Sequence, residues 1–214
     1  DVYKRQMQEH GLHARIKRAF IRTTDSDYNY KLYPNLIRGM CITGTNQVWA
    51  SDITYIRIPN GFVFLAVILD LFSRKVIGWS ISKNIDTELV LNALKMAIAR
   101  RNPLQGVVHH SDRGVQYVSD SYIKELKAHG FFISNSSKGN PYDNAFVESF
   151  MKTLKQNEVY MANYDTYLEV LYNLPRFIEE VYNEKRLHSS IDYLTPNELE
   201  ALEQKGEKNL DQFR

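Results

Sequence analysis

The chain has 214 residues, 43% of them hydrophobic, so it can bury one good core with an appendage and is too apolar to be disordered. Its longest apolar run, Phe62 to Leu69, is well short of the roughly 18 residues of a membrane span, so we expect no membrane partner. The single cysteine, Cys41, excludes an internal disulfide and indicates a reducing, cytoplasmic compartment. Because the chain begins with Asp1 rather than methionine, we expect it to be part of a longer protein.

The net charge of +2 is unevenly distributed along the chain. Residues 1–22, called here the basic arm, hold six Lys or Arg against two acidic residues, which leaves the remainder slightly acidic. A basic arm on an acidic body fits nucleic-acid binding combined with a carboxylate site, although a solvated helix face explains the arm equally well. Within the arm, Arg15, Lys17 and Arg18 are the candidate contacts to DNA phosphate.

Hydrophobic periodicity and turn residues predict an alternation of strands and helices. We expect strands at 48–58, 62–70, 75–81, 104–110 and 131–133, and helices at 2–20, 86–101, 119–129, around Glu148, 164–182 and 195–203. Three strands joined by hairpins and then strands alternating with helices predict an α/β fold, in which a mixed five-stranded sheet has helices on both faces. We divide the chain into an N-terminal basic segment with a linker (1–44), a core (45–160) and a C-terminal helical extension (161–214).

Three carboxylates suggest a site that binds divalent metal ions. Asp52 lies in the middle of a strand, Asp112 lies just past the end of another, and Glu148 lies on a helix. A charge in a buried strand is costly unless it is paired or bound to metal, and three converging carboxylates repel one another. Oxygen ligands favour Mg²⁺ or Mn²⁺, and two such ions activate a nucleophile and stabilise the leaving oxygen of a phosphodiester. Taken singly, each carboxylate is more often a cap or turn residue.

The face of the Glu148 helix adds further candidates. Because an α-helix turns about 100° per residue, Asn144, Lys152 and Lys155 share the face of Glu148. Either lysine binds a DNA phosphate or is simply an exposed helix residue. Asn144 either orients Glu148 or a nucleotide, or has a structural role. The turn at 139–141 sets where this helix begins, so we expect Glu148 to be the ligand least in place without metal and DNA.

Residues around Asp112 have open roles. Arg113 and Gln116 either contact DNA or support their loop, and His110 contacts Asp112 or a water. We interpret Asp70, at the end of the second strand, as a cap rather than a fourth ligand.

Four motifs together identify a resemblance. The sequence resembles the catalytic half of bacterial insertion-sequence transposases of the Asp-Asp-Glu superfamily, and more narrowly the second-reading-frame product of the IS-three family. Between Asp112 and Glu148 lie 35 residues, the spacing typical of the integrase-like group, and Lys155 supplies the basic residue that follows the glutamate by seven. The motifs are Trp49-Ala-Ser-Asp-Ile-Thr-Tyr55, His110-Ser-Asp-Arg-Gly-Val-Gln-Tyr117, Gly139-Asn-Pro-Tyr-Asp-Asn-Ala-Phe-Val-Glu-Ser-Phe150, and Tyr182-Asn-Glu-Lys-Arg-Leu-His188 with Thr195-Pro196.

The resemblance implies a ribonuclease-H-like fold, with Asp52, Asp112 and Glu148 as catalytic residues and ligands of two Mg²⁺ or Mn²⁺ ions. The implied reaction is cleavage at element ends followed by attack of the freed 3′-hydroxyl on another DNA phosphodiester. The implied setting is a homo-oligomer on paired DNA ends, with an upstream-frame partner, at the bacterial nucleoid. Two alternatives stay open. A plain ribonuclease-H-like nuclease would never join strands, and a silent DNA-binding protein derived from a transposase would not need all three carboxylates.

Overall fold

A computed structural model of the chain describes residues 6, 9–10, 32–137 and 144–206. The expected N-terminal helix falls almost wholly outside these residues. Arg15, Lys17 and Arg18 of the basic arm and the turn at 139–141 also lie outside them.

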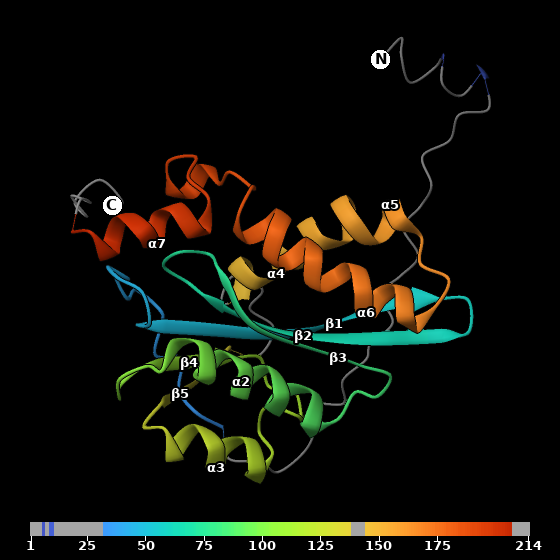
Figure 1. Cartoon of the computed structure of the whole chain (residues 1–214). Helices are drawn as coiled ribbons and strands as arrows, with labels where there is room; N and C mark the ends of the chain where they lie inside the picture. Colours follow the sequence, from blue (N-terminus) through green and yellow to red (C-terminus); the bar gives the residue numbers. More distant parts are fainter. Residues whose placement is uncertain (1–5, 7–8, 11–31, 138–143, 207–214) are drawn as a thin grey trace.

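The described residues form a five-stranded mixed sheet in the order β3-β2-β1-β4-β5 (Figure 1). Its central strand β1 pairs antiparallel with β2 and parallel with β4, β2 pairs antiparallel with β3, and β4 pairs parallel with β5. The strands are β1 (Val48–Ile58), β2 (Gly61–Asp70), β3 (Val76–Ser82), β4 (Val108–Ser111) and β5 (Phe132–Asn135). This arrangement confirms the predicted mixed sheet.

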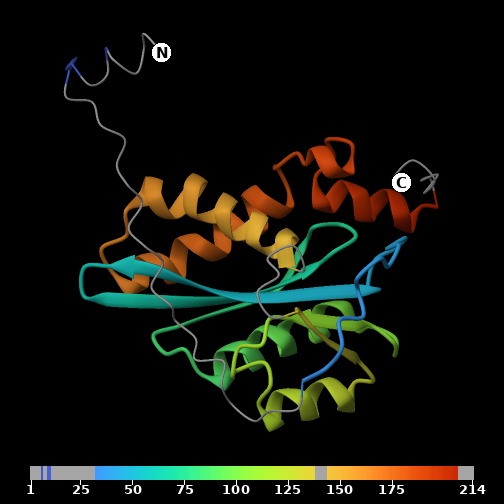
Figure 2. The ribbon, with the colours of Figure 1, turned by 180° about the vertical axis from the view of Figure 1, so that it is seen from behind.

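Helices cover both faces of the sheet, as predicted. In Figures 1 and 2, α2 (Thr87–Arg101) and α3 (Asp120–Ala128) lie on one side, and the elements from α4 onward lie on the other. That second layer contains α4 (Ala145–Leu154), the π-helical turn η2 (Lys155–Val159), α5 (Tyr160–Ala162), α6 (Tyr167–Arg176), the π-helical η3 (Phe177–Asn183), the 3₁₀ turn η4 (Ser189–Ile191) and α7 (Pro196–Gln204).

The alternation of side chains along β1 divides the core into two layers. Val48 and Ala50 pack in the layer that contains α4 and α6, whereas Trp49 packs in the layer that contains α2 and α3. Because successive strand residues point to opposite faces, Asp52 belongs to the same face as Val48 and Ala50. Asp52 therefore lies on the face of the sheet that is covered by α4, the helix that carries Glu148.

Most predicted elements differ from the structure by one or two residues at their ends, and two differ more. The fourth strand was expected from Leu104, but β4 begins only at Val108, because Leu104 is 88% exposed and Gly106 turns the chain with a positive φ of 101°. The helix expected at 164–182 is α6 followed by η3. Pro175 has no N–H to donate in the α-helical pattern, and the π-helix begins two residues after it.

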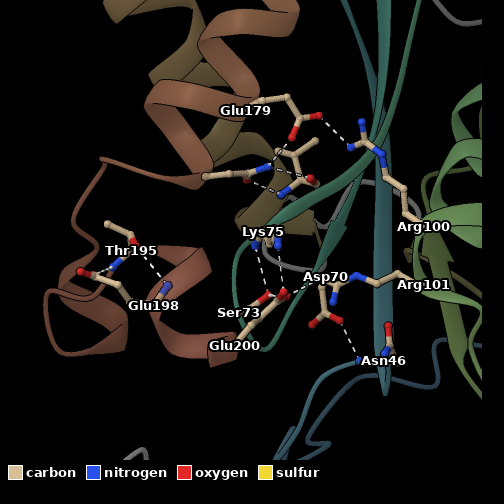
Figure 3. Close-up of polar contacts among 12 residues, drawn as sticks. Asn46, Asp70, Ser73, Lys75, Arg100, Arg101, Glu179, Thr195, Glu198 and Glu200 are labelled. Carbon is tan, nitrogen blue, oxygen red and sulfur yellow. Dashed lines mark hydrogen bonds and ion pairs between the residues drawn. The ribbon is translucent and has the colours of Figure 1, made fainter. Parts of the chain in front are cut away.

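A buried ionic cluster attaches α7 to the sheet (Figure 3). The Glu200 carboxylate is 4% exposed and accepts hydrogen bonds from Ser73 Oγ at 2.6 Å and Lys75 Nζ at 3.0 Å, and from Arg101 at the end of α2. Burial raises the pKa of Glu200, but the hydrogen bond and charge of Arg101, with Ser73 and Lys75, outweigh it and hold the pKa below its usual value. The cluster therefore joins three distant parts of the chain through one carboxylate.

A second polar contact attaches η3 to the edge strand β3. The Asn183 side chain accepts from the Val76 N–H and donates to the Val76 carbonyl, both at 2.9 Å. Glu179 accepts from Trp79 Nε1 at 2.9 Å and from Arg100 at 2.7 Å. These contacts form the interface between the predicted core and the described part of the extension, and the division at residue 160 stays a prediction.

Within the described residues, no helix combines the length and the apolar character that a membrane crossing requires.

Glu200→Gln should destabilise the protein by roughly 2–3 kcal/mol at pH 7, because it leaves Lys75 and Arg101 without their buried counter-charge. A carboxyl whose folded pKa is depressed contributes stability above its unfolded pKa and loses it as pH falls. The difference between variant and wild type in urea unfolding should therefore shrink below about pH 4.5. Glu180→Gln is the matched control, since Glu180 forms only an exposed pair with Arg176, and its effect should stay within about 0.5 kcal/mol. Equal effects of the two variants would contradict a stabilising role for the cluster.

Candidate active site

The register of the parallel strands β1 and β4 brings two of the predicted carboxylates together. Ser51 of β1 lies opposite Ser111, the last residue of β4. The next residue on each strand is Asp52 or Asp112, so the two side chains project from neighbouring positions at the edge where β4 ends. Carboxyl ends of parallel strands are where α/β sheets place ligand-binding groups.

The Asp112 carboxylate is held by the turn that follows β4. Its Oδ1 accepts a hydrogen bond from the Gly114 N–H at 2.8 Å. A Cβ at position 114 would lie 2.9 Å from that same oxygen, so the turn can close on the carboxylate only with glycine there. The sequence Asp112-Arg-Gly114 thus fixes one oxygen of Asp112 by its backbone.

The two aspartates keep part of their surface open to solvent, although protein surrounds them. Burial raises the pKa of Asp52 to about 7, helped by the charges of Asp112 and Glu148 and opposed by the Ile53 N–H and by Lys155. Burial likewise raises the pKa of Asp112, against the Gly114 hydrogen bond. Negative charge is therefore gathered here with too little positive charge to balance it.

Glu148 lies on α4, which is anchored by the buried side chains Val147, Phe150 and Leu154. The Glu148 side chain is exposed, yet its charge is close enough to raise the pKa of Asp52. Among the described residues, no three His, Cys, Asp or Glu side chains are grouped as ligands for a metal ion. The structure thus brings Asp52 and Asp112 together and leaves Glu148 outside a ligand cluster.

Lys155 lies at the junction of α4 and η2, close to Asp52. Its pKa is lowered by burial and supported by the Asp52 charge, and its Nζ lies 4.6 Å from the centre of the Tyr55 ring. Lys155 and Tyr55 also line a cleft of about 430 Å³ with Arg57 and Tyr160. Lys155 is thus a half-buried cation between the aspartates and an open groove, in contrast to Lys152, whose side chain is exposed.

Asn144 connects α4 to the strand that carries Asp52. Its Nδ2 makes a long contact of 3.5 Å to the Ser51 carbonyl, and its buried Oδ1 has no hydrogen-bond partner among the described residues. As N-cap of α4 it makes no side-chain capping bond. The side chain therefore links the start of the Glu148 helix to the residue before Asp52.

The structure gives hydrogen-bond partners to Arg113 and Gln116, whose roles the sequence left undecided, and to Asp70. Arg113 Nε donates to the Ser136 carbonyl at 2.9 Å, and Gln116 Nε2 donates to the Ile85 carbonyl at 3.4 Å, so both support their loop. Asp70 accepts from the backbone N–H groups of Asn46 and Phe72, as a cap does.

Sequence reasoning missed a group of buried polar side chains behind Asp112. His110 contacts Ser134 Oγ through Nδ1 at 2.8 Å and Ser136 Oγ through Nε2 at 3.1 Å, and Asn135 Nδ2 donates to the Asp112 carbonyl at 3.3 Å. The available signal was the polar run 134–136 directly after the apolar residues 131–133 of the fifth strand.

Comparison with known proteins identifies relatives over most of the chain. Two models, both described as integrase core domain, match residues 43–141 and 129–196. The chain is 41% identical to the transposase for insertion sequence element IS904 of Lactococcus lactis, covering 82% of this chain and 73% of that protein. It is 38% identical to the transposase InsF for insertion sequence IS3A of Escherichia coli, covering 91% of this chain and 68% of that protein.

The fold is shared with retroviral integrases. The catalytic core domain of HTLV-2 integrase, solved in complex with magnesium in a dimeric form, superposes with a TM-score of 0.54 at 19% sequence identity. The match covers 73% of this chain and 97% of that one. It confirms the predicted ribonuclease-H-like fold.

Asp52→Asn should stabilise the metal-free protein at pH 8 and have no such effect near pH 4. A carboxyl whose folded pKa is raised disfavours the folded state once it ionises, so its penalty grows between its unfolded value of 3.8 and its folded value of about 7. We expect a gain of about 1–2 kcal/mol, less than the full pKa shift implies because solvent reaches the group.

The measurement is thermal unfolding in a chelator across this pH range, with Asp120→Asn on the exposed first turn of α3 as the control. A gain in stability that is independent of pH, or that is equal in the control, would show that ionised Asp52 does not destabilise the folded protein.

Proposed function

This chain belongs to the family of bacterial insertion-sequence transposases and contains its integrase core, and on that basis we propose that Asp52, Asp112 and Glu148 form its catalytic site. The observation that carries the proposal is the register that sets Asp52 beside Asp112, on the sheet face covered by the Glu148 helix. The proposed reaction is cleavage at the ends of an insertion element, followed by transfer of the freed 3′-hydroxyl onto a phosphodiester of target DNA.

The donor set fits Mg²⁺ or Mn²⁺. All three groups are carboxylates, which hard divalent cations prefer, and a cation would relieve the burial and the neighbouring negative charge that raise the pKa of Asp52. A related fold has been solved with magnesium, in the HTLV-2 integrase core. We propose that Asp52, Asp112 and Glu148 would hold two ions, which would stabilise the charge that develops on the oxygens of the reacting phosphodiester.

The protein contributes position and charge. The middle of β1 and the end of β4 would fix the two aspartates, and the Gly114 N–H occupies only one oxygen of Asp112, so that among the described residues the other oxygen is open to a ligand. Glu148 would enter from α4, whose buried face fixes the helix against the sheet. Lys155 would pair with a DNA phosphate beside Asp52, because it is a half-buried cation that faces open space.

Other residues would serve DNA binding less directly. Lys152 is exposed one turn from Glu148 and would bind the backbone without approaching the aspartates. Asn144 would keep α4 in register with Asp52 through its contact to Ser51, and Arg113 would hold the Asp112 loop. An in-line displacement of this kind needs no covalent protein–DNA intermediate.

We further propose that the protein acts as a homo-oligomer on paired element ends, together with an upstream-frame partner, at the bacterial nucleoid. Paired ends require two active sites in one assembly, and the HTLV-2 integrase core was solved in a dimeric form. The basic arm would supply additional phosphate contacts.

Asp112→Asn and Glu148→Gln should each reduce Mg²⁺-dependent strand joining by at least about 100-fold, the scale of losing one electrostatic contact to the transition state. The assay is incubation of labelled element ends with target DNA, scored separately for cleavage and for joined product. Asp120→Asn, an exposed control of the same chemistry, should join strands like the wild type. Undiminished joining by Asp112→Asn would refute the site, and cleavage without any joined product in the wild type would indicate a nuclease.

Replacing Arg15, Lys17 and Arg18 by glutamine should weaken DNA binding and flatten its salt dependence. Each lost phosphate contact lowers the slope of log affinity against log salt by about 0.9 for duplex DNA. Titrations at several salt concentrations measure the slope. A triple glutamine variant at the exposed residues Lys95, Lys124 and Lys127 removes the same charge from the α2–α3 side and should change the slope less. Equal slopes in both variants would exclude the basic arm as a specific contact.

A further inference from the structure

The described part of the predicted linker, residues 32–44, is bonded to β5. The Tyr33 N–H donates to Asn135 Oδ1 at 3.1 Å, and the Leu36 N–H donates to Ser134 Oγ at 2.9 Å. Figure 2 shows this blue segment rising from the α3 side past the sheet toward α7, where the Thr45 N–H donates to Glu203 Oε1 at 2.9 Å. The linker is therefore attached at both ends rather than loosely tethered.

One amide joins this linker to Asp112. Asn135, whose backbone lies opposite Ser111 in the parallel register, is 2% exposed. Its Oδ1 accepts from Tyr33, while its Nδ2 donates to Ser111 Oγ and to the Asp112 carbonyl, both at 3.3 Å. The Oδ1 acceptor of Asn135 thus bonds to the linker, and its Nδ2 donor bonds to the end of β4.

A second route runs in parallel through Ser134. Its hydroxyl accepts from Leu36 and contacts His110 Nδ1 at 2.8 Å. The other ring nitrogen of His110, Nε2, contacts Ser136 Oγ at 3.1 Å, so the ring bridges two serines of this segment. The Ser136 carbonyl in turn accepts from Arg113, the neighbour of Asp112.

These side chains occupy positions that an apolar core would fill at lower cost. Ser134 and Asn135 are buried in a four-residue strand, and buried polar groups are tolerated only where each is hydrogen-bonded. Here both bond to the linker on one side and to the β4 end on the other. Contacts of this kind behind a ligand fix its orientation, and their loss commonly weakens metal binding.

We propose that Asn135 is a positioning residue that couples the docked linker to Asp112, so that the cation affinity of the site depends on how the linker lies on β5. The inference rests on the proposed role of Asp112 as a metal ligand. Through the linker, the segment that leads from the basic arm is bonded to the backbone of that ligand.

The test compares Asn135→Asp with Asn183→Asp in the full chain. Asn135→Asp keeps the acceptor for Tyr33 but replaces the donor to the Asp112 carbonyl by an oxygen. Asn183→Asp makes the same change at an equally buried amide that, among the described residues, bonds to Val76 and Glu179 and not to the β4 end. Mn²⁺ binding is measured by calorimetry, unfolding temperature without metal by thermal melts, and strand joining as a function of Mg²⁺ concentration.

We expect Asn135→Asp to weaken Mn²⁺ binding about 10-fold and to raise the Mg²⁺ needed for half-maximal joining by the same factor. Asn183→Asp should lower the unfolding temperature by a similar amount yet bind Mn²⁺ like the wild type. If Asn135→Asp does not fold, Ser134→Ala replaces it, since it removes the acceptor for Leu36 and should shift Mn²⁺ affinity in the same direction.

Wild-type Mn²⁺ affinity in Asn135→Asp, alongside lost affinity in Asp112→Asn, would overturn the coupling and leave the proposed site intact. Wild-type affinity in Asp112→Asn would instead overturn the proposed site. Equal losses of Mn²⁺ affinity in Asn135→Asp and Asn183→Asp would show that Asn135 contributes only to general stability, and would contradict the inference.

Discussion

Ser51 and Ser111 lie opposite each other on two parallel strands, and this register places two like charges, Asp52 and Asp112, at adjacent positions. The arrangement is unfavourable by itself, because burial and mutual repulsion together raise the pKa of Asp52 to about 7. It persists because the surrounding structure leaves the strands no other register. Trp49 and Val48 are buried in opposite layers, and a slip by one residue would exchange them.

The rest of the molecule holds this unfavourable pair from two sides. The layer of α4 and α6 closes one face of the sheet, and the Glu200 cluster attaches α7 to the turn between β2 and β3 and to the end of α2. On the other side, Ser134, Asn135 and Ser136 support the chain immediately before and after Asp112. Strain concentrated at one edge is thus offset by packing and hydrogen bonds elsewhere.

Much of the fold followed from sequence because the relevant signals are local. The apolar run of β2 and the β-branched residues of β1 gave these strands nearly their observed bounds, and Asp86, where the helix at 86–101 was expected to begin, caps α2 with a carboxylate that accepts from Leu89. The start of β4 was misplaced because Leu104 reads as core but lies on the surface before a Gly106 turn. Nothing local distinguishes that exposed leucine from a buried one.

The three carboxylates of the candidate site could be predicted from the sequence, but the side chains that hold the chain around them could not. Asp52 was notable as a charge inside an apolar strand, and the spacing from Asp112 to Glu148 resembled a known pattern. The partners of Asn135 are 102 residues and 23 residues away in sequence, so only the folded register shows that it bridges the linker and Asp112. Glu200 likewise meets Ser73 across 127 residues, a pairing that no periodicity indicates.

The most direct test of the account is anomalous diffraction from the protein crystallised with element-end DNA and Mn²⁺. The account predicts manganese density in contact with the Asp52 and Asp112 carboxylates, with Glu148 drawn in from α4 as a further ligand. DNA-bound protein in which these positions hold no manganese, or in which the carboxylates stay more than about 10 Å apart, would contradict it.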